Sequence, residues 1–585
     1  MFFFDRHVDG RLYRVVAQSV WDPRKKQPVS RQVVLGPADP APVADLSDTR
    51  TVGTKRVGDV GALAWVAEQL DVVRLIDKAC GHVSPSKGPS VGELALGVAL
   101  QRACAPGAKR DLAEFLDGCI PRISCLPTER FTGQVFHRGA VGVTDEQLER
   151  AQLAIAHAAV TRFGLSAEVL AFDSTNFDTH IATTTEGELA QRGHAKSKRS
   201  DLRVVGLGVL VSETGHVPLL YRTYPGNSSD QEVLTSCLKG LARLHDELDA
   251  AEGGARKSGR TLVRDGGFWS PQLELELESA RYHSLISLPL SHAASAKALS
   301  FAAERGRMQP LRGELKDVRA ARLEAQVGEL DRTLIVVESL ELLRGQKRGI
   351  AVALRKAKIE LRTIERRVQA GKIDQPTLEA RVKKALAREH LADFVVTTIG
   401  GSTSKPTLHW KVDAALRHEL ERTRLGRRVL CTDRKLWGTE RIVYAFRGQW
   451  NVEELFRRSK KGGLVPWGPS FQRADSSLRL HTFATVLGLT LVALAKLALG
   501  SKKSALALMR ELGDINATLV RTSTGQTGRR PTVMLPPELS TAQKKAVKLF
   551  ELTRWMPTLS TTITKHPDIQ SRKTSVLERK VRNSG

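Results

Sequence analysis

The sequence predicts an α/β protein in which a sheet domain is interrupted by a long inserted region. Strand-like apolar runs alternate with amphipathic helical runs after residue 166, a charged helical hairpin then breaks this order, and a helical region lies ahead of both. We therefore expect six segments. They are an N-terminal basic β-hairpin and linker (1–55), a helical region (56–165), the first part of the sheet domain (166–289), an insertion (290–430), the second part (431–510) and a basic C-terminal region (511–585).

The N-terminal segment alternates apolar and polar residues in "RLYRVVAQSVWDPRKKQPVSRQVVLG" and turns at "DPRKKQP", which predicts a hairpin. The next region has helical apolar spacing in "ALAWVAEQLDVVRLID" and "DEQLERAQLAIAHAAVTRF". A small helical domain on a basic chain favours a DNA-binding module. A plain helical scaffold fits the same pattern equally well.

The sheet domain begins with "EVLAF", an apolar strand that ends at Asp173. Two further strands surround a turn at "SETGH", and "PGNSSD" supplies a cap for the following helix. The strand "RTLVR" then leads to Asp265 in "DGGFWS", and "YHSLISLP" predicts one more strand. The order places a carboxylate at the ends of two strands of one sheet.

The insertion contains apolar residues at spacings of three and four, followed by a turn at "QAGKIDQP" and a second helix. This pattern predicts a helical hairpin packed as a short coiled coil, with strands "FVVTTI" and "RRVLCT" beside it. The apolar positions of the two helices are Leu354, Ala357, Leu361, Ile364 and Val368, and Leu378, Val382 and Ala385.

Residues 441–460, "RIVYAFRGQWNVEELFRRSK", predict a basic helix with two adjacent glutamates. At the helical period one stripe faces inward, and Glu453 and Glu454 lie on opposite flanks of it. The stripe consists of Val452, Leu455, Phe456 and Ser459. Two ion pairs at i, i+4, each stabilising by roughly 0.3–0.5 kcal/mol, are the simplest interpretation of the glutamates.

The chain is strongly basic, with 90 Lys and Arg against 63 Asp and Glu in 585 residues and a net charge of +27. Such a charge attracts polyanions, so nucleic acid is the leading partner, ahead of an anionic membrane surface or plain solubility. The start "MFFFDRHVDG" does not resemble an export signal. The apolar run "FATVLGLTLVALAKLALG" contains Lys496 and predicts a buried helix.

Six cysteines form no C-x-x-C pair, which indicates thiols of a reducing compartment. We therefore expect a cytoplasmic protein.

Asp173 and Asp265 are the strongest candidates for chemistry. An aspartate after an apolar strand is often only a cap, but neighbouring strands lie about 4.8 Å apart, so two such carboxylates can converge on one cation. Mg²⁺ prefers carboxylates together with phosphate oxygens. A third carboxylate on a helix would complete a two-metal site for phosphoryl transfer.

The order of these residues resembles the DDE transposases of bacterial insertion sequences, in the group with a Tyr-Arg-Glu-Lys signature. Four stretches carry the resemblance: "AFDSTNF", "GHAKSKRSDLRVVGLGVLVSETGHVPLLYRTYPGNSSD", "VRDGGFWS" and "WNVEELFRRSK". The resemblance implies an RNase H-like catalytic domain split by the insertion. It also implies that Asp173, Asp265 and Glu453 are the catalytic metal ligands, with Glu453 preferred to Glu454 because it lies three residues after Trp450 and seven before Lys460.

The signature departs from the family upstream of the glutamate. Family spacing would place Tyr at 446 and Arg at 449, where this chain has Phe446 and Gln449, while Tyr444 and Arg447 lie two positions away. The expected DNA-binding residues are Lys198, Arg199, Arg447, Trp450, Arg457 and Lys460. Among the tryptophans, Trp450 fits base stacking and core packing about equally.

These features predict a transposase that binds terminal inverted repeats and catalyses cleavage and strand transfer with two Mg²⁺ ions, for which Mn²⁺ can substitute. The expected partners are element-end and target double-stranded DNA, with a homodimer in the end complex. A hairpin intermediate is a route that the resemblance implies. An inactive DNA-binding regulator and an RNase H-like nuclease are the alternatives.

Overall fold

The computed structural model describes residues 1–8, 11–22, 26–38, 49–81, 88–182, 184–254, 259–304, 306–388, 390–460, 462–522, 532–535 and 538–556. The chain forms two compact units. The first unit contains Met1–Leu165, Asn176–Val205 and the residues from Phe456 onward, and the second contains Ser166–Thr175 and Gly206–Leu455.

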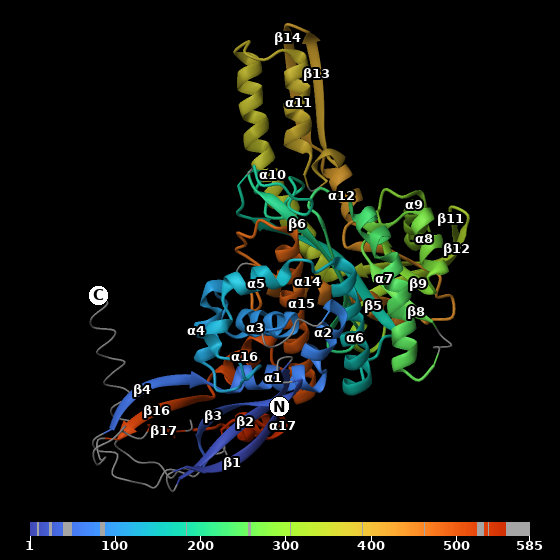
Figure 1. Ribbon diagram of the computed structural model, residues 1–585. Helices are drawn as coiled ribbons and strands as arrows, with labels where there is room; N and C mark the ends of the chain where they lie inside the picture. The colour runs from blue at the N-terminus through green and yellow to red at the C-terminus, as the bar shows by residue number, and fades with distance from the viewer. Residues whose placement is uncertain are drawn as a thin grey trace. The chain divides into compact units, whose positions relative to one another are not determined.

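The first unit contains two small sheets, each of three strands (Figure 1). The predicted hairpin corresponds to the antiparallel pair β2 and β3, and its turn at residues 23–25 lies outside the described residues. The end of the predicted linker is a strand, β4, which pairs with β16 from the far end of the chain. The strands are β1 (Phe2–Val8), β2 (Arg11–Asp22) and β3 (Gln27–Pro37) in one sheet, and β4 (Thr49–Arg56), β16 (Asn516–Thr522) and β17 (Thr532–Leu535) in the other.

A bundle of helices makes up the rest of the first unit. Its centre is α15, which packs against α3 so closely that a Cβ on Gly488 would lie 3.0 Å from the carbonyl oxygen of Ala99. The helix is long and apolar enough to cross a membrane, but 83% of its apolar window is buried within the protein, as the sequence predicted for this run. The helices are α1 (Gly58–Gln69), α2 (Val72–Cys80), α3 (Val91–Cys104), α4 (Leu112–Asp117), α5 (Gly133–Ala140), α6 (Asp145–Phe163), α15 (Asp475–Leu499), α16 (Ala505–Gly513) and α17 (Thr541–Leu549).

The second unit is built on a nine-stranded mixed sheet in the order β10-β11-β12-β15-β9-β8-β5-β6-β7. Strands β5, β8 and β9 are parallel to one another, and β9, β15, β12, β11 and β10 alternate in direction. The strands are β5 (Val169–Thr179), β6 (Arg203–Ser212), β7 (Pro218–Pro225), β8 (Arg260–Arg264), β9 (Tyr282–Leu288), β10 (Gln309–Pro310), β11 (Val318–Val327), β12 (Leu330–Ser339) and β15 (Arg427–Thr432). The strands predicted around "EVLAF", "RTLVR", "YHSLISLP" and "RRVLCT" are therefore present.

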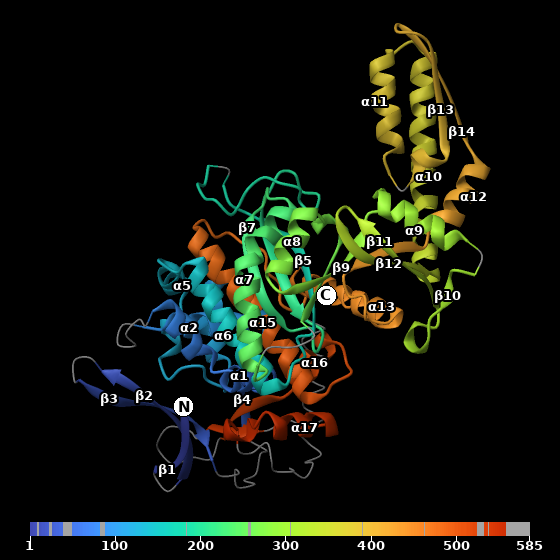
Figure 2. The same ribbon diagram turned by 90° about the vertical axis from the view of Figure 1, so that its right-hand side faces the viewer.

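Helices cover both faces of the centre of this sheet. On one face, α7 (Asp230–Ala251) accepts a hydrogen bond from the Tyr282 hydroxyl at the carbonyl of Leu241, and α9 (Ala293–Ala303) packs in a cluster with Ile286 of β9. The helix α8 (Pro271–Ser279) lies beside α7 (Figure 2). On the other face lies α13 (Thr439–Arg447), which α14 (Gln449–Ser459) follows.

Two glycines of β6 are explained by aromatic rings that lie against them. A Cβ on Gly206 would lie 2.0 Å from the ring of Tyr224, and a Cβ on Gly208 would lie 3.0 Å from the ring of Phe172. Phe172 immediately precedes Asp173. The glycines of "VVGLGVLV" therefore make room for the aromatic residues that support β5 around Asp173.

The insertion combines a helical hairpin with a two-stranded ribbon, and the two lie side by side in both views (Figures 1 and 2). All eight predicted apolar positions of the helical hairpin belong to one cluster, but that cluster also contains Phe394, Leu408 and Trp410. The ribbon therefore shares a core with the helices, so the helices are more than a two-helix coiled coil. The elements are α10 (Leu340–Gln369), α11 (Gln375–Leu386), β13 (Val395–Ser402), β14 (Lys405–Val412) and α12 (Ala414–Thr423).

Residues 318–339, which fall inside the predicted insertion, form β11 and β12 of the main sheet. Short 3-10 helices complete the described elements at Lys109–Asp111, Thr128–Arg130, Gly266–Phe268, Gly313–Leu315, Leu391–Asp393 and Leu552–Arg554.

Candidate active site

Asp173 and Asp265 lie opposite each other on neighbouring parallel strands. The register pairs Ala171 of β5 with Val263 of β8, and each aspartate is two residues further along the chain: Asp173 lies within β5, and Asp265 directly follows the last residue of β8. Continuing the register therefore places Asp173 beside Asp265 at the carboxyl end of β8, with both side chains on the face that α13 covers. The strand β5 continues past Asp173 to Thr179, so the prediction that this strand ends at Asp173 is wrong.

Each carboxylate accepts a hydrogen bond from the next backbone N–H. Ser174 N donates to Oδ1 of Asp173 at 2.7 Å, and Gly266 N donates to Oδ1 of Asp265 at 2.8 Å. The turn after Asp265 requires glycine, because a Cβ on Gly266 would lie 2.4 Å from the carbonyl oxygen of Ser287. Asp265 is exposed and has no ion-pair partner within the described ranges.

A third aspartate, Asp230, connects the two turns, and sequence reasoning did not single it out. Its Oδ1 accepts a hydrogen bond of 2.7 Å from the Ser174 hydroxyl, and its Oδ2 would lie 3.1 Å from a Cβ on Gly267. Asp230 is the first residue of α7, directly after the cap Ser229. The available signal was "PGNSSD", which we interpreted only as a helix cap.

Tyr224 supports the same corner of the sheet. Its hydroxyl donates to the carbonyl of Thr175 at 3.1 Å, and burial raises the pKa of this hydroxyl to about 12. The tyrosine therefore stays protonated and acts as a donor that fixes β5 next to Asp173.

Glu453 lies on α14 with the burial pattern that the sequence predicted. Val452, Leu455, Phe456 and Ser459 are all buried, whereas Glu453 is exposed and Glu454 is half-buried. Glu453 has no ion-pair partner in the part of the chain that the structure describes. The i, i+4 pair expected for Glu453 is therefore absent, and its carboxylate faces solvent.

The predicted helix over 441–460 is two helices, which is a correction. The helix α13 ends at Arg447, Gly448 follows it, and α14 begins at Gln449. Phe446 and Gln449, at the positions where family spacing expects Tyr and Arg, are both buried. Tyr444, Arg447 and Trp450 are exposed, and Trp450 keeps 60% of its surface, which excludes full core packing of its indole.

The basic residues Lys198, Arg199, Arg457 and Lys460 belong to the first unit and are exposed. Arg199 donates to Asp201 at 2.5 and 2.7 Å, and this contact lowers the pKa of Asp201 to about 2. Asn176 holds the loop that carries Lys198, since its side chain donates to His194 O at 2.8 Å and accepts from Lys196 N at 2.9 Å.

The donor set fits a divalent cation in part. Among the residues that the structure describes, no three His, Cys, Asp or Glu side chains lie together closely enough to hold a metal ion. Asp173 and Asp265 supply the paired carboxylate oxygens that a hard cation such as Mg²⁺ prefers. Glu453 belongs to the same unit but is not grouped with them.

Comparison with known proteins identifies the class of this chain. Residues 164–464 match the family described as the transposase DDE domain, so the chain belongs to that family. The match contains Asp173, Asp265 and Glu453. DDE transposases generally use divalent metals.

A search among curated proteins finds no significant match. Among solved structures, the chain is similar to one described as the piggyBac transposase synaptic complex with hairpin DNA, solved by cryo-electron microscopy. The identity is 11%, the similarity covers 78% of each chain, and the TM-score is 0.36, a level from which we draw no argument.

Proposed function

We propose that this protein is a transposase that binds the terminal inverted repeats of an insertion sequence, cleaves the DNA there and joins the ends to target DNA. The observation that carries the proposal is the register of β5 and β8, which puts Asp173 beside Asp265 at one end of the sheet. Membership in the transposase DDE domain family supports the same chemistry. We further propose that the sheet is RNase H-like and that the chain belongs to the bacterial group with a Tyr-Arg-Glu-Lys signature.

Asp173, Asp265 and Glu453 are the residues that would hold Mg²⁺, or Mn²⁺ in its place. Bound there, the metal would activate the attacking oxygen and stabilise the leaving one. The chain itself positions the two aspartates through the turn at Gly266 and the Asp230–Ser174 hydrogen bond.

The DNA would be held by exposed basic and aromatic residues, and the net charge of +27 supports a polyanionic substrate. Pairing two element ends requires two copies of the site, so we propose a homodimer in the end complex. We also propose that the protein acts in the bacterial cytoplasm, at the nucleoid, where its DNA substrate would lie. The proposed contact residues are Lys198, Arg199, Arg447, Trp450, Arg457 and Lys460.

The test is cleavage and joining of a labelled element-end duplex with Mg²⁺ by the wild type, Glu453→Gln and Glu454→Gln. The proposal expects Glu453→Gln to abolish both steps while DNA binding persists, and Glu454→Gln to remain active. Equal activity of Glu453→Gln and wild type would contradict the role of Glu453. Wild-type binding without cleavage would favour an inactive regulator, and cleavage without joining would favour a nuclease.

A further inference from the structure

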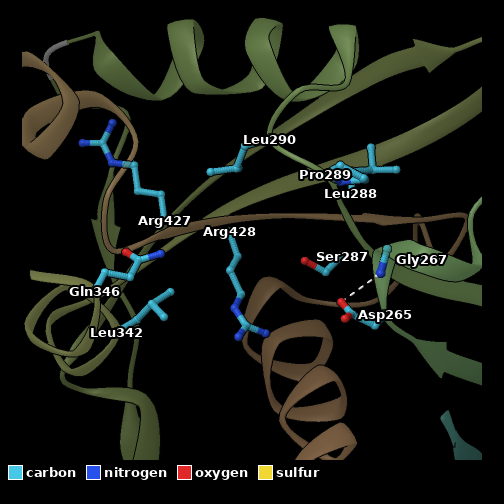
Figure 3. A pocket seen from close by; sticks show the side chains of 11 residues that line it. Asp265, Gly267, Ser287, Leu288, Pro289, Leu290, Leu342, Gln346, Arg427 and Arg428 are labelled. Atoms are coloured by element: carbon cyan, nitrogen blue, oxygen red, sulfur yellow. Dashed lines mark hydrogen bonds between the residues drawn. The ribbon is translucent and has the colours of Figure 1, made fainter. Parts of the chain in front are cut away.

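A cavity of about 370 Å³ adjoins Asp265 within the second unit (Figure 3). One side consists of the turn Asp265–Gly267, the floor is the end of β9, and the other side combines the start of α10 with the start of β15. Its floor and one wall are partly apolar, whereas Arg427 and Arg428 bring two guanidinium groups to its edge. Its volume is in the range of small-ligand sites.

The two arginines have different surroundings. Arg427 donates to Glu338 at 3.1 and 3.2 Å, so its charge is balanced within the protein. Arg428 is exposed and has no ion pair among the described residues; its guanidinium lies 5.8 Å from the centre of the Phe446 ring. In Figure 3 the two side chains leave opposite sides of the strand.

Strand register places Arg428 on the same face as the aspartates. Continuing the β8–β9 register from Arg264 and Ile286 sets Asp265 beside Ser287, and Ser287 pairs with Leu430 of β15. Arg428 is two residues before Leu430 on an antiparallel strand, so its side chain has the same orientation and lies toward the carboxyl end of β9. Asp173, Asp265 and Arg428 therefore lie along one edge of one face.

The cavity has the Asp265 carboxylate on one side and, on the other, an arginine without an ion pair among the described residues, an arrangement that suits an anion held beside a cation. We propose that Arg428 binds a phosphate of the DNA strand that enters the site at Asp265, through the paired N–H groups of its guanidinium. Phe446 lies within cation–π distance of the guanidinium and helps to position it on this face. This inference rests on the proposed function, because it assigns the substrate contact of the same site.

The phosphate can belong to the element end or to the target DNA. The test therefore uses the full chain with two substrates: an uncut element-end duplex for cleavage, and pre-cut ends with plain target DNA for joining. The variants are Arg428→Ala and Arg428→Lys. The matched control is Arg424→Ala, an exposed arginine at the end of α12 that does not line the cavity.

We expect Arg428→Ala to raise the half-saturating DNA concentration about tenfold or more, since it removes hydrogen bonds to a charged group. Arg428→Lys should recover part of this loss, and Arg424→Ala should behave as wild type. A loss in cleavage and joining together would assign the phosphate to the element end, and a loss in joining alone would assign it to the target.

Binding measured against salt separates this inference from the proposed function. The slope of log K against log salt is negative, and removing one phosphate contact reduces its magnitude by about 0.9, whether or not the protein cuts. A wild type that binds but never cuts would overturn the proposed function alone. If Arg428→Ala matches Arg424→Ala in cleavage, in joining and in the salt slope on both duplexes, the inference about Arg428 is wrong.

Discussion

Asp265 and Asp433 follow similar apolar strands, "RTLVR" and "RRVLCT", yet they lie at opposite ends of the sheet. The reason is direction: β8 is parallel to β9, and β15 is antiparallel to it. At the amino end of β9, Asp433 accepts a hydrogen bond from Ser284 N at 2.9 Å and contacts His283 Nδ1 at 2.8 Å. At the carboxyl end of β8, the hydrogen bond that Asp265 accepts among the described residues comes from its own turn, and Asp265 lines the cavity.

The comparison shows how to distinguish an aspartate that serves the fold from one that serves a ligand. Burial alone would raise the pKa of Asp433, but its hydrogen bond to His283 and the charge of that ring hold the pKa below its usual range. Asp433 therefore has its partners inside the protein. Asp265 faces solvent on the same face of the sheet as Asp173 and Arg428, where a ligand can reach it.

The largest expected effect is on activity at the carboxyl end. Asp265→Asn should lower the rate of DNA cleavage by at least about a thousandfold, because a metal ligand stabilises the transition state by several kcal/mol. Its thermal unfolding should stay close to that of wild type, since Asp265 is exposed. Rates from a gel assay on labelled end duplex, with melting curves as the control, test both parts. If Asp265→Asn cuts at the wild-type rate, Asp265 is not part of the active site.

The corresponding substitution of Asp433, at the amino end of β9, should affect the stability of the fold instead of the activity. Asp433→Asn should lower the free energy of unfolding by about 1.5–3 kcal/mol, the range for hydrogen bonds to charged groups. Denaturant titrations measure this difference, and cleavage per folded molecule should be unchanged.

The sign of the pH dependence follows from the lowered pKa of Asp433. The stabilisation is complete above the unfolded pKa of about 3.9 and is lost as the pH falls through the folded value. The difference between wild type and Asp433→Asn should therefore shrink below about pH 4. A difference that grows as the pH falls would contradict this assignment.

The packing behind Asp173 can be tested without changing a charge. Gly206→Ala should cost about 1–3 kcal/mol in unfolding free energy, because its Cβ would overlap the Tyr224 ring and force local shifts. Gly345→Ala is the control: no atom lies within 4 Å of its added Cβ in α10, so it should stabilise by about 0.5–1 kcal/mol. Equal effects of the two variants in denaturant titrations would show that the ring does not constrain Gly206.

The smallest expected effect concerns DNA contacts in the first unit. Here too, one side chain is paired within the protein and its neighbour is open to a ligand. Lys198 is exposed and has no acidic partner in the described ranges, whereas Arg199 is paired with Asp201. Lys198→Ala should reduce the magnitude of the negative slope of log K against log salt by about 0.9, and Arg199→Ala should reduce it less. Binding of fluorescent end duplex at several salt concentrations provides the slopes. A larger change in slope for Arg199→Ala than for Lys198→Ala would show that Arg199, rather than Lys198, contacts the DNA.

Periodicity was sufficient to predict the central strands, the buried stripe of α14 and the apolar positions of α10 and α11, because each depends on local spacing. It did not predict that β11 and β12 extend the main sheet or that β14 shares a core with α10. Those features depend on pairing between distant segments, which a single sequence does not encode locally. Gly448, where the predicted helix breaks, lies between two segments that each fit a helix.

The residues of the candidate site were likewise predictable only where a local sequence pattern marks them. The two aspartates were evident because each directly follows an apolar run, although β5 in fact continues past Asp173. Asp230 was not evident, because a helix cap and a carboxylate that connects two turns have the same sequence pattern. Arg428 was missed because strand order and direction, rather than local spacing, place it beside Asp265.

The most direct test of the central claim is a Mn²⁺ titration of the protein–DNA complex by electron paramagnetic resonance. It would compare wild type with Asp265→Asn and Asp433→Asn. The account predicts that Asp433→Asn binds Mn²⁺ as wild type does and that Asp265→Asn loses this binding. Binding that survives in Asp265→Asn, or is lost equally in both variants, would contradict the assignment of the carboxyl end as the metal site.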